Sequence, residues 1–223
     1  METAGKVICI ELDTRMMQIL QDRFSMYNNF KLINNDVLKV DLKNLIKENK
    51  KGEIKNVKIV ANLPYYITTP IIMKLLEERL EIESITVMVQ KEVADRLVAK
   101  PGEKDSGAIT YAISYFANAE KILEVPNTSF IPAPEVNSSV IKLKILKEPS
   151  VKVESEEMLF KVIKLAFAQK RKTLLNALTN GKLAGKEEIE KMLTFLNLDL
   201  KIRGEKLSLQ DFANIANYMK NKL

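Results

Sequence analysis

The chain has 223 residues, with 35 Lys and Arg against 29 Asp and Glu, one cysteine, no histidine and no tryptophan. Its 46% hydrophobic residues can bury a core, and the length fits one large domain or a large and a small one. One cysteine forms no internal disulfide or zinc cluster, and without histidine there is no imidazole base or metal ligand. These counts exclude intrinsic disorder, zinc hydrolases and proteases with a catalytic histidine.

The first residues carry no targeting signal. Met1-Glu2-Thr3 is neither basic nor apolar, and the longest apolar runs have the length of a strand. We therefore expect a cytoplasmic, monomeric protein with no metal and no membrane partner.

The first half of the chain alternates strand and helix patterns. Strands are predicted at 7–12, 31–35, 57–61 and 84–90, and helices at 15–26, from Thr69 onward, and at 92–99. A lysine-rich connection is predicted between Asp36 and Gly52. Strands separated by helices indicate a parallel sheet covered on both faces, so the fold class is α/β.

The second half changes character near residue 147. A helix at 108–117 precedes an antiparallel pair, 121–125 and 138–146, around a proline-rich loop. Only helices are predicted beyond it, at 156–169, 171–178, 186–196 and 208–220. We therefore predict a sheet domain at 1–147 and a small all-helical domain at 148–223.

Two carboxylates lie at the ends of predicted strands. Nucleotide-binding sheets hold a ribose with a carboxylate at the end of the second parallel strand, because two hydroxyls can donate to it. Glu11 occupies that position, and Asp36, after the next strand, could accept from an adenine amine. Acids at strand ends are also common as solvated loop residues, so neither position is specific by itself.

The segment Asn62-Leu63-Pro64-Tyr65 follows directly on the strand 57–61, at the sheet edge where such folds bind ligands. The Asn62 side-chain oxygen and the Leu63 carbonyl could accept both hydrogens of an exocyclic amine and aim its lone pair at a methyl group. Pro64 stiffens the turn and Tyr65 could stack on the base. The alternative is an ordinary strand-to-helix turn in which Asn62 caps and Tyr65 packs.

Four segments in order resemble the KsgA family, the S-adenosylmethionine-dependent ribosomal RNA adenine dimethyltransferases. They are Asn-Leu-Pro-Tyr-Tyr-Ile-Thr-Thr-Pro at 62–70, Val-Gln-Lys-Glu-Val-Ala-Asp-Arg-Leu at 89–97, Phe-Ile-Pro-Ala-Pro-Glu-Val-Asn-Ser-Ser-Val at 130–140, and Phe-Ala-Gln-Lys-Arg-Lys-Thr-Leu at 167–174. The resemblance spans nearly the whole chain, and four ordered motifs are far more specific than one.

The resemblance implies a Rossmann-like methyltransferase sheet and a role for each matching residue. Glu11 would bind the cofactor ribose and Asp36 its adenine. Asn62 would bind the target amine and also belong to the cofactor site, with Leu63 and Pro64 completing the catalytic turn. Tyr65 and Phe130 would stack on a flipped adenine. The implied substrate is small-subunit ribosomal RNA within a pre-ribosomal particle.

Basic residues gather in the predicted helical domain. From Lys147 onward there are 15 Lys and Arg against 10 Asp and Glu, which is +5 of the whole net charge of +6. Lys170, Arg171 and Lys172 lie where a helix is predicted to start or continue, and such a face could bind phosphates without reading sequence. A solvated helix face is the competing interpretation.

The glycine-rich loop that this family places after its first strand is missing. The seven glycines form no Gly-x-Gly, and the sequence opens at what resembles the end of the family's first helix. We therefore expect an N-terminally truncated sheet, with the arm, first strand and glycine loop upstream of Met1. Loss of that central strand would leave backbone groups unpaired or force another pairing.

Three alternatives stay open. Erm-type methyltransferases of large-subunit RNA carry similar motifs, although 64–70 and 90–92 look more like KsgA. Adenine-specific DNA methyltransferases use a related Asn-Pro-Pro-Tyr/Phe signature without the basic helical appendage. A ribosome-assembly factor that binds RNA without catalysis is the alternative of another class, and S-adenosylmethionine binding separates it from an enzyme.

Overall fold

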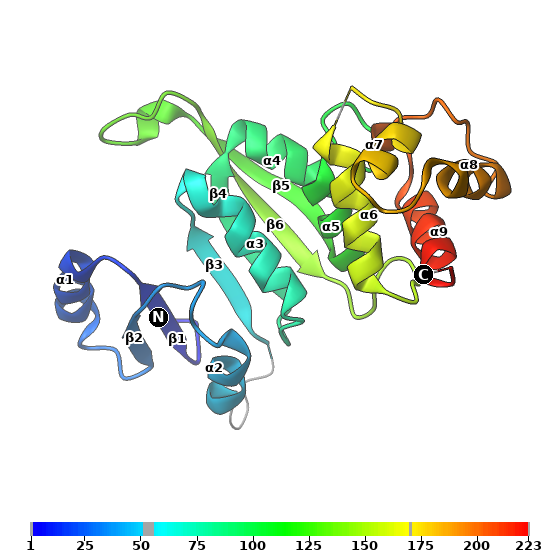
Figure 1. Ribbon diagram of the computed structural model, residues 1–223. Helices are drawn as coiled ribbons and strands as arrows, with labels where there is room; N and C mark the ends of the chain where they lie inside the picture. The colour runs from blue at the N-terminus through cyan, green and yellow to red at the C-terminus, as the bar shows by residue number, and fades with distance from the viewer. Residues whose placement is uncertain (1, 51–55, 170, 223) are drawn as a thin grey trace. The chain divides into compact units, whose positions relative to one another are not determined.

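The structure, a computed structural model, describes residues 2–50, 56–169 and 171–222 (Figure 1). Its strands form two sheets. One is the pair β1 (Val7–Glu11) and β2 (Phe30–Asn34), and the other has the order β3 (Lys58–Asn62), β4 (Ser84–Gln90), β6 (Ser138–Ile145), β5 (Ala117–Val125). All six predicted strands are present, but the described residues form two sheets where one was predicted.

Helices form a large part of the remaining chain. They are α1 (Thr14–Phe24), α2 (Leu42–Asn49), α3 (Thr68–Glu77), α4 (Lys91–Val98), α5 (Ala108–Phe116), α6 (Glu156–Ala168), α7 (Leu174–Asn180), α8 (Lys186–Phe195) and α9 (Leu209–Lys220). The prediction of a plain connection before Gly52 was wrong, because it contains α2. Asp41 caps this helix by accepting a hydrogen bond from the Asn44 backbone N–H at 2.9 Å.

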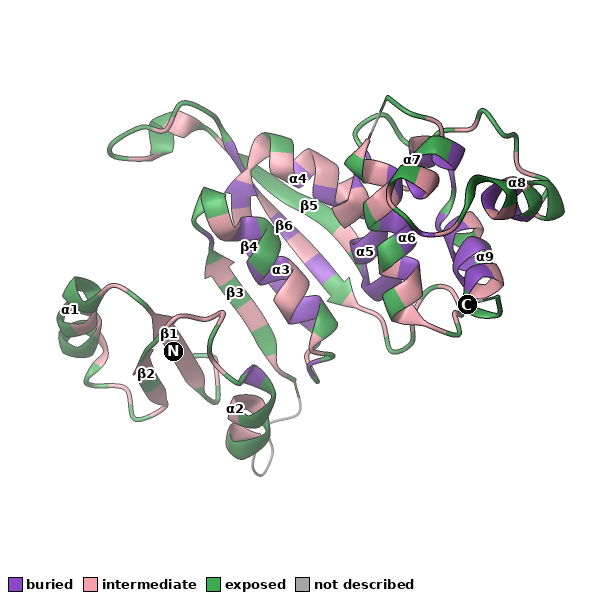
Figure 2. Cartoon of the chain, viewed as in Figure 1, coloured by how far each residue is buried: buried purple, intermediate pink, exposed green. Residues whose placement is uncertain are grey.

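Burial differs along the chain, as Figure 2 shows. All five residues of β1 are half-buried and α1 has no buried residue. β4 and β6 instead alternate buried with less buried side chains, and Ile85, Val87 and Ile141 are almost fully enclosed. The two sheets therefore differ in how much apolar surface they remove from water.

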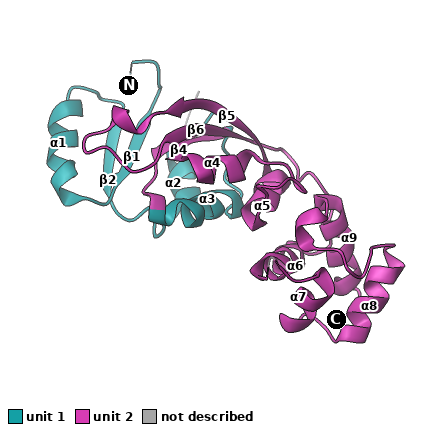
Figure 3. Cartoon of the chain, turned by 90° about the horizontal axis from the view of Figure 1, so that it is seen from above, with its two compact units in different colours: residues 1–58, 66–83 teal, residues 59–65, 84–223 magenta. Residues whose placement is uncertain are grey.

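The chain divides into two compact units (Figure 3). Unit 1 comprises 1–58 and 66–83, and unit 2 comprises 59–65 and 84–223. In unit 1, β1 and β2 are parallel, and α1 contacts both strands. The α3 helix of the same unit buries four apolar side chains, those of Ile71, Ile72, Leu75 and Leu76.

In unit 2, β6 lies between β4 and β5 and is antiparallel to both. The α4 helix contacts all three strands, and α5 contacts α4, β5, α6 and α9. Because α5 leads directly into β5, that strand begins at Ala117, four residues before the predicted start at Lys121.

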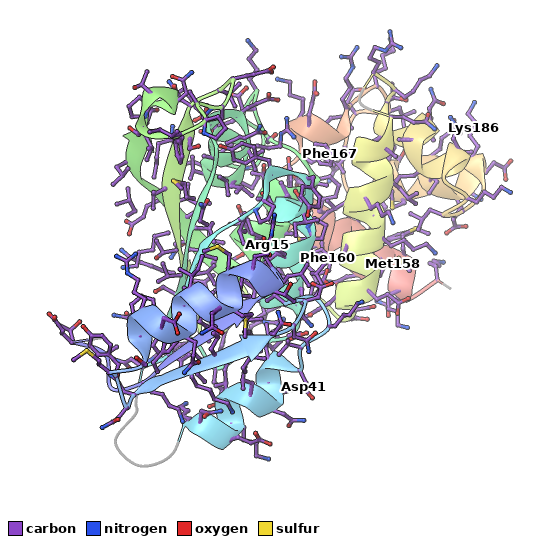
Figure 4. The ribbon with its side chains drawn as sticks, turned by 90° about the vertical axis from the view of Figure 1, so that its left-hand side faces the viewer. Arg15, Asp41, Met158, Phe160, Phe167 and Lys186 are labelled. Atoms are coloured by element: carbon purple, nitrogen blue, oxygen red, sulfur yellow. The ribbon has the colours of Figure 1, made fainter. Side chains whose placement is uncertain are left out.

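Aromatic rings join α5 to the helices that follow the sheet. The Tyr111 ring lies 5.2 Å from that of Phe167 and 4.9 Å from that of Phe212. Its fully buried hydroxyl donates to the Leu207 carbonyl at 2.6 Å and accepts from the Gly102 N–H at 3.1 Å. Figure 4 labels Phe167 on α6, together with Phe160, whose ring lies 5.6 Å from that of Phe116.

The predicted domain boundary between residues 147 and 148 falls within unit 2 and stays a prediction.

The edge strand β5 carries a bulge and a row of charges. The register with β6 shifts between Lys121 and Leu123, so Ile122 is the extra residue. Its basic and acidic side chains are paired with neighbouring elements. The pairs are Lys121 with Asp95 at 2.6 Å, Glu124 with Lys91 at 2.6 Å and Glu120 with Lys144 at 3.1 Å.

Candidate active site

Unit 1 places its two predicted carboxylates at the same end of the parallel pair. Glu11 is the last residue of β1, opposite Asn34 of β2. The Asn35 N–H donates to the Glu11 carbonyl at 3.1 Å, and Asp36 follows directly. The carboxyl ends of neighbouring parallel strands therefore bring Glu11 and Asp36 to one edge.

Both carboxylates already order their own loops. Glu11 Oε1 accepts from the Asp13 N–H at 2.8 Å, and Asp36 Oδ1 accepts from the Leu38 N–H at 2.9 Å. Each carboxylate has lone pairs beyond these bonds, and both residues are only half-buried. Two acceptors at one sheet edge suit the ribose hydroxyls and the amine of an adenosyl group. The sequence offers no Gly-x-Gly for the methionine part of S-adenosylmethionine.

The predicted catalytic turn leaves the four-stranded sheet in unit 2. Asn62 ends β3 and is exposed, as is Pro64. Leu63 between them is buried, and its N–H donates to the Met88 carbonyl of β4 at 3.3 Å. The buried leucine therefore anchors the turn while the Asn62 amide faces outward.

Tyr65 is held at its hydroxyl end. Its oxygen lies 2.9 Å from Oγ of Ser138, the first residue of β6, and the residue remains 37% exposed. This contact holds the hydroxyl end, and the exposed part of the residue is open to contact with a ligand.

Phe130 lies in the loop between β5 and β6, directly after a 3-10 turn at Asn127–Ser129. Its N–H donates to the Asn127 carbonyl at 3.2 Å, and the residue is half-buried. Val125 and Ser138 pair in the sheet, so the loop closes next to the residue that holds Tyr65. Sequence reasoning missed Ser138 although it lies inside the motif at 130–140.

The basic run is only partly described and is not helical where predicted. Lys170 lies outside the described residues. Arg171 and Lys172 are exposed in a turn between α6 and α7, and the Lys172 N–H donates to the Gln169 carbonyl at 2.9 Å. The helix predicted from Arg171 begins at Leu174, because Thr173 Oγ1 accepts from the Asn176 N–H at 3.3 Å and caps it.

Within 2–50, 56–169 and 171–222, no three His, Cys, Asp or Glu side chains are grouped to hold a metal ion. No helix in these ranges is both long and apolar enough to cross a bilayer.

Comparison with known proteins extends over nearly the whole chain. Residues 1–221 match the family described as ribosomal RNA adenine dimethylase. A Geobacillus protein named ribosomal RNA small subunit methyltransferase A is 50% identical over 99% of this chain and 76% of its own length. The protein of that name from Alkaliphilus oremlandii is 47% identical, over the whole chain and 77% of its own length.

Two solved structures share the fold. A dimethyladenosine transferase from Plasmodium falciparum has a TM-score of 0.76 and 26% identity, and the match covers 94% of this chain and 80% of that one. The 23S rRNA methyltransferase ErmE has a TM-score of 0.66 and 20% identity, over 98% of this chain and 84% of its own. The predicted Rossmann-like methyltransferase architecture is thereby confirmed.

Proposed function

Because the chain belongs to the ribosomal RNA adenine dimethylase family, we propose that it methylates N6 of an adenine in small-subunit ribosomal RNA, twice in succession. The observation that carries this proposal is the exposed Asn62 amide on a turn anchored by buried Leu63, beside a tethered Tyr65. The relatives named small subunit methyltransferase A support the choice of RNA. We propose that this RNA is presented within a pre-ribosomal particle.

The exocyclic amine of adenine is a poor nucleophile, because its lone pair is delocalised into the ring. The Asn62 side-chain oxygen and the Leu63 carbonyl accept its two hydrogens and favour a pyramidal nitrogen. Pro64 restricts the turn between the amide and Tyr65. The amine becomes acidic once methylated and loses its proton to water, so no histidine base is needed.

The target base must leave its stack to reach this turn. Extraction costs a few kcal/mol, and stacking on aromatic side chains returns about 1–3 kcal/mol per base. Tyr65 and Phe130 supply the aromatic surfaces, since both remain partly exposed.

S-adenosylmethionine supplies an electrophilic methyl group. We assign Glu11 to its ribose hydroxyls and Asp36 to its adenine amine, and we propose that Asn62 also contributes to cofactor binding. The common edge of β1 and β2 supports the first two assignments.

Paired substitutions test these roles. Asn62→Ala removes an acceptor that acts on the target amine, so methyl transfer falls by about a hundredfold, or on the order of 3 kcal/mol. Affinity for S-adenosylmethionine stays within a few-fold.

Glu11→Ala mainly affects the cofactor. It weakens equilibrium binding of S-adenosylmethionine by roughly tenfold or more, because charge-assisted hydrogen bonds are lost.

Methyl transfer is measured with a labelled methyl group and unmodified small-subunit particles. Binding of S-adenosylmethionine is measured by calorimetry. Transfer by Asn62→Ala within tenfold of the parent would remove Asn62 from the reaction. An unchanged dissociation constant for Glu11→Ala would remove Glu11 from the cofactor site.

For the RNA surface we propose Lys170, Arg171 and Lys172, with the exposed Lys161 and Lys164 of α6 close by in sequence. Changing residues 170–172 to Gln lowers the affinity for RNA at low salt, and the loss is similar for RNAs of unrelated sequence. The slope of log affinity against log salt falls by about 0.7–0.9 for each lost phosphate contact. An unchanged slope, with an unchanged melting temperature by circular dichroism, would assign these residues to a solvated surface.

The alternative raised by the sequence, an RNA-binding assembly factor without catalysis, makes the opposite prediction about the cofactor. It predicts RNA binding with no measurable S-adenosylmethionine binding. Micromolar binding of S-adenosylmethionine would exclude it.

A further inference from the structure

Ser138 and Asn137 occupy the point where the turn bearing Tyr65 and the loop bearing Phe130 meet the sheet. Ser138 pairs with Gln90 of β4 on one side and Val125 of β5 on the other. Its side chain is fully buried, and its Oγ lies 2.9 Å from the Tyr65 hydroxyl oxygen. The tyrosine is thereby tied to a residue that two neighbouring strands hold in place.

Asn137 closes the loop on the other side. Its Oδ1 accepts from the Asn127 backbone N–H at 3.0 Å, and the Asn127 side chain donates to the Pro134 carbonyl at 3.1 Å. The Asn137 carbonyl accepts from the Lys91 N–H at 2.9 Å, where α4 begins. Phe130 donates its N–H to the Asn127 carbonyl, so the phenylalanine is connected to Asn137 through one residue.

We propose that Asn137 and Ser138 are positioning residues, which together orient the two aromatic rings that receive the target base. This inference rests on the proposed function, since it assigns them to the same adenine site. Neither side chain needs to touch the substrate. Each acts through a hydrogen bond to the segment carrying one ring, Ser138 on Tyr65 and Asn137 on the loop of Phe130.

The alternative is that these bonds only stabilise the fold. A stabilising bond would shift the unfolding midpoint, whereas a positioning bond would also change catalysis and the environment of one ring. Ser139 is a matched control, because it is equally buried and its side chain points to the opposite face of β6. Among the described residues its hydroxyl has no hydrogen-bond partner.

The first experiment follows the Tyr65 ring by NMR in the full chain labelled with carbon-13 tyrosine, with Tyr65→Phe used for assignment. Ser138→Ala shifts the Tyr65 ring signals and leaves those of the other tyrosines in place. Ser139→Ala leaves all of them unchanged. Tyr65 signals that do not respond to Ser138→Ala would overturn the proposal, and this readout needs no activity.

The second experiment is a double-mutant cycle on methyl transfer to small-subunit particles. Ser138→Ala and Tyr65→Phe each lower kcat/KM by about two- to tenfold, the range of one neutral hydrogen bond. The double variant is no worse than either single one, because both remove the same bond. Additive losses, or no loss with Ser138→Ala, would overturn the proposal.

Asn137→Ala tests the loop of Phe130 independently. It lowers kcat/KM by a similar factor, and the same fall is seen when Tyr65→Phe is already present. In the Phe130→Ala background, Asn137→Ala causes no further fall in kcat/KM. One outcome would retain the proposed function and reject the positioning role. In that outcome Asn62→Ala loses activity, while Ser138→Ala and Asn137→Ala are fully active. Full activity in Asn62→Ala, Tyr65→Ala and Phe130→Ala would instead reject the proposed site itself.

Discussion

The parallel pair β1–β2 and the antiparallel pair β4–β6 are built from similar apolar runs but are buried to different extents. Every residue of β1 is half-buried, and Leu12 beyond it is 62% exposed. Ile85, Val87 and Ile141 of the second pair are at most 1% exposed. Strand pairing and a contacting helix such as α1 therefore do not by themselves bury a strand as deeply as β4 and β6 are buried.

This difference separates the two halves of the proposed chemistry. The carboxylates Glu11 and Asp36 belong to the sparsely buried pair, and the Asn62 turn is anchored to the well-buried sheet through Leu63. Few buried apolar contacts mean low local stability, so the β1–β2 segment should open more readily than β4–β6.

The largest expected effect comes from matched truncations in the two regions. Leu143→Ala in β6 removes a fully buried side chain and costs about 2–5 kcal/mol of unfolding free energy. Ile10→Ala in β1 removes a half-buried one and costs about 1 kcal/mol. Urea unfolding followed by circular dichroism measures both, and equal costs would show that the two sheets are packed alike.

Tyr111→Phe tests the buried polar link within the better-packed region. The change leaves the Leu207 carbonyl and the Gly102 N–H without the hydroxyl, which costs about 1–3 kcal/mol. Burial raises the pKa of Tyr111, so its hydroxyl stays protonated and able to donate. Tyr66→Phe is the control, because Tyr66 is exposed. The same melting temperature for both variants would contradict the assigned role of the buried hydroxyl.

The smallest effect concerns acid stability of the less buried region. Asp13 caps α1, and its hydrogen bonds to Arg15 lower the pKa of the carboxyl to about 2. Because the folded pKa lies below the unfolded one, the contribution is complete above about pH 4 and is lost as pH falls toward 2. Asp13→Asn should flatten this acid limb: asparagine keeps the cap but loses the charged hydrogen bonds to Arg15, so the variant is slightly less stable than the parent at neutral pH and equal to it near pH 2. Thermal melts at pH 6 and pH 3 measure the change, and parallel curves for parent and variant would contradict it.

Local pattern predicted the elements better than their assembly. β4 matches its predicted bounds, because alternating buried residues and flanking polar ones define it. α2 was missed because Lys43 and Lys47 conceal the helical spacing of Leu42, Leu45 and Ile46. Division into two sheets depends on pairing between distant segments, which no local pattern encodes.

The site shows the same limit. Glu11, Asp36 and the turn at 62–65 could be singled out because each lies at the end of a predicted strand. Ser138 could not, because its hydrogen bond reaches Tyr65, 73 positions earlier in the chain. The catalytic and binding roles of these residues stay predictions until the substitutions above are measured.

The irregular edge strand β5 also bears on self-association. An uncovered edge offers unpaired backbone groups to any neighbouring sheet, which is a common route to aggregation. The bulge at Ile122 interrupts the regular spacing of those groups, and charged side chains on both sides of it are held in ion pairs. The bulge and the row of charged side chains make β5 a poor template for another strand, so this edge resists sheet-to-sheet polymerisation.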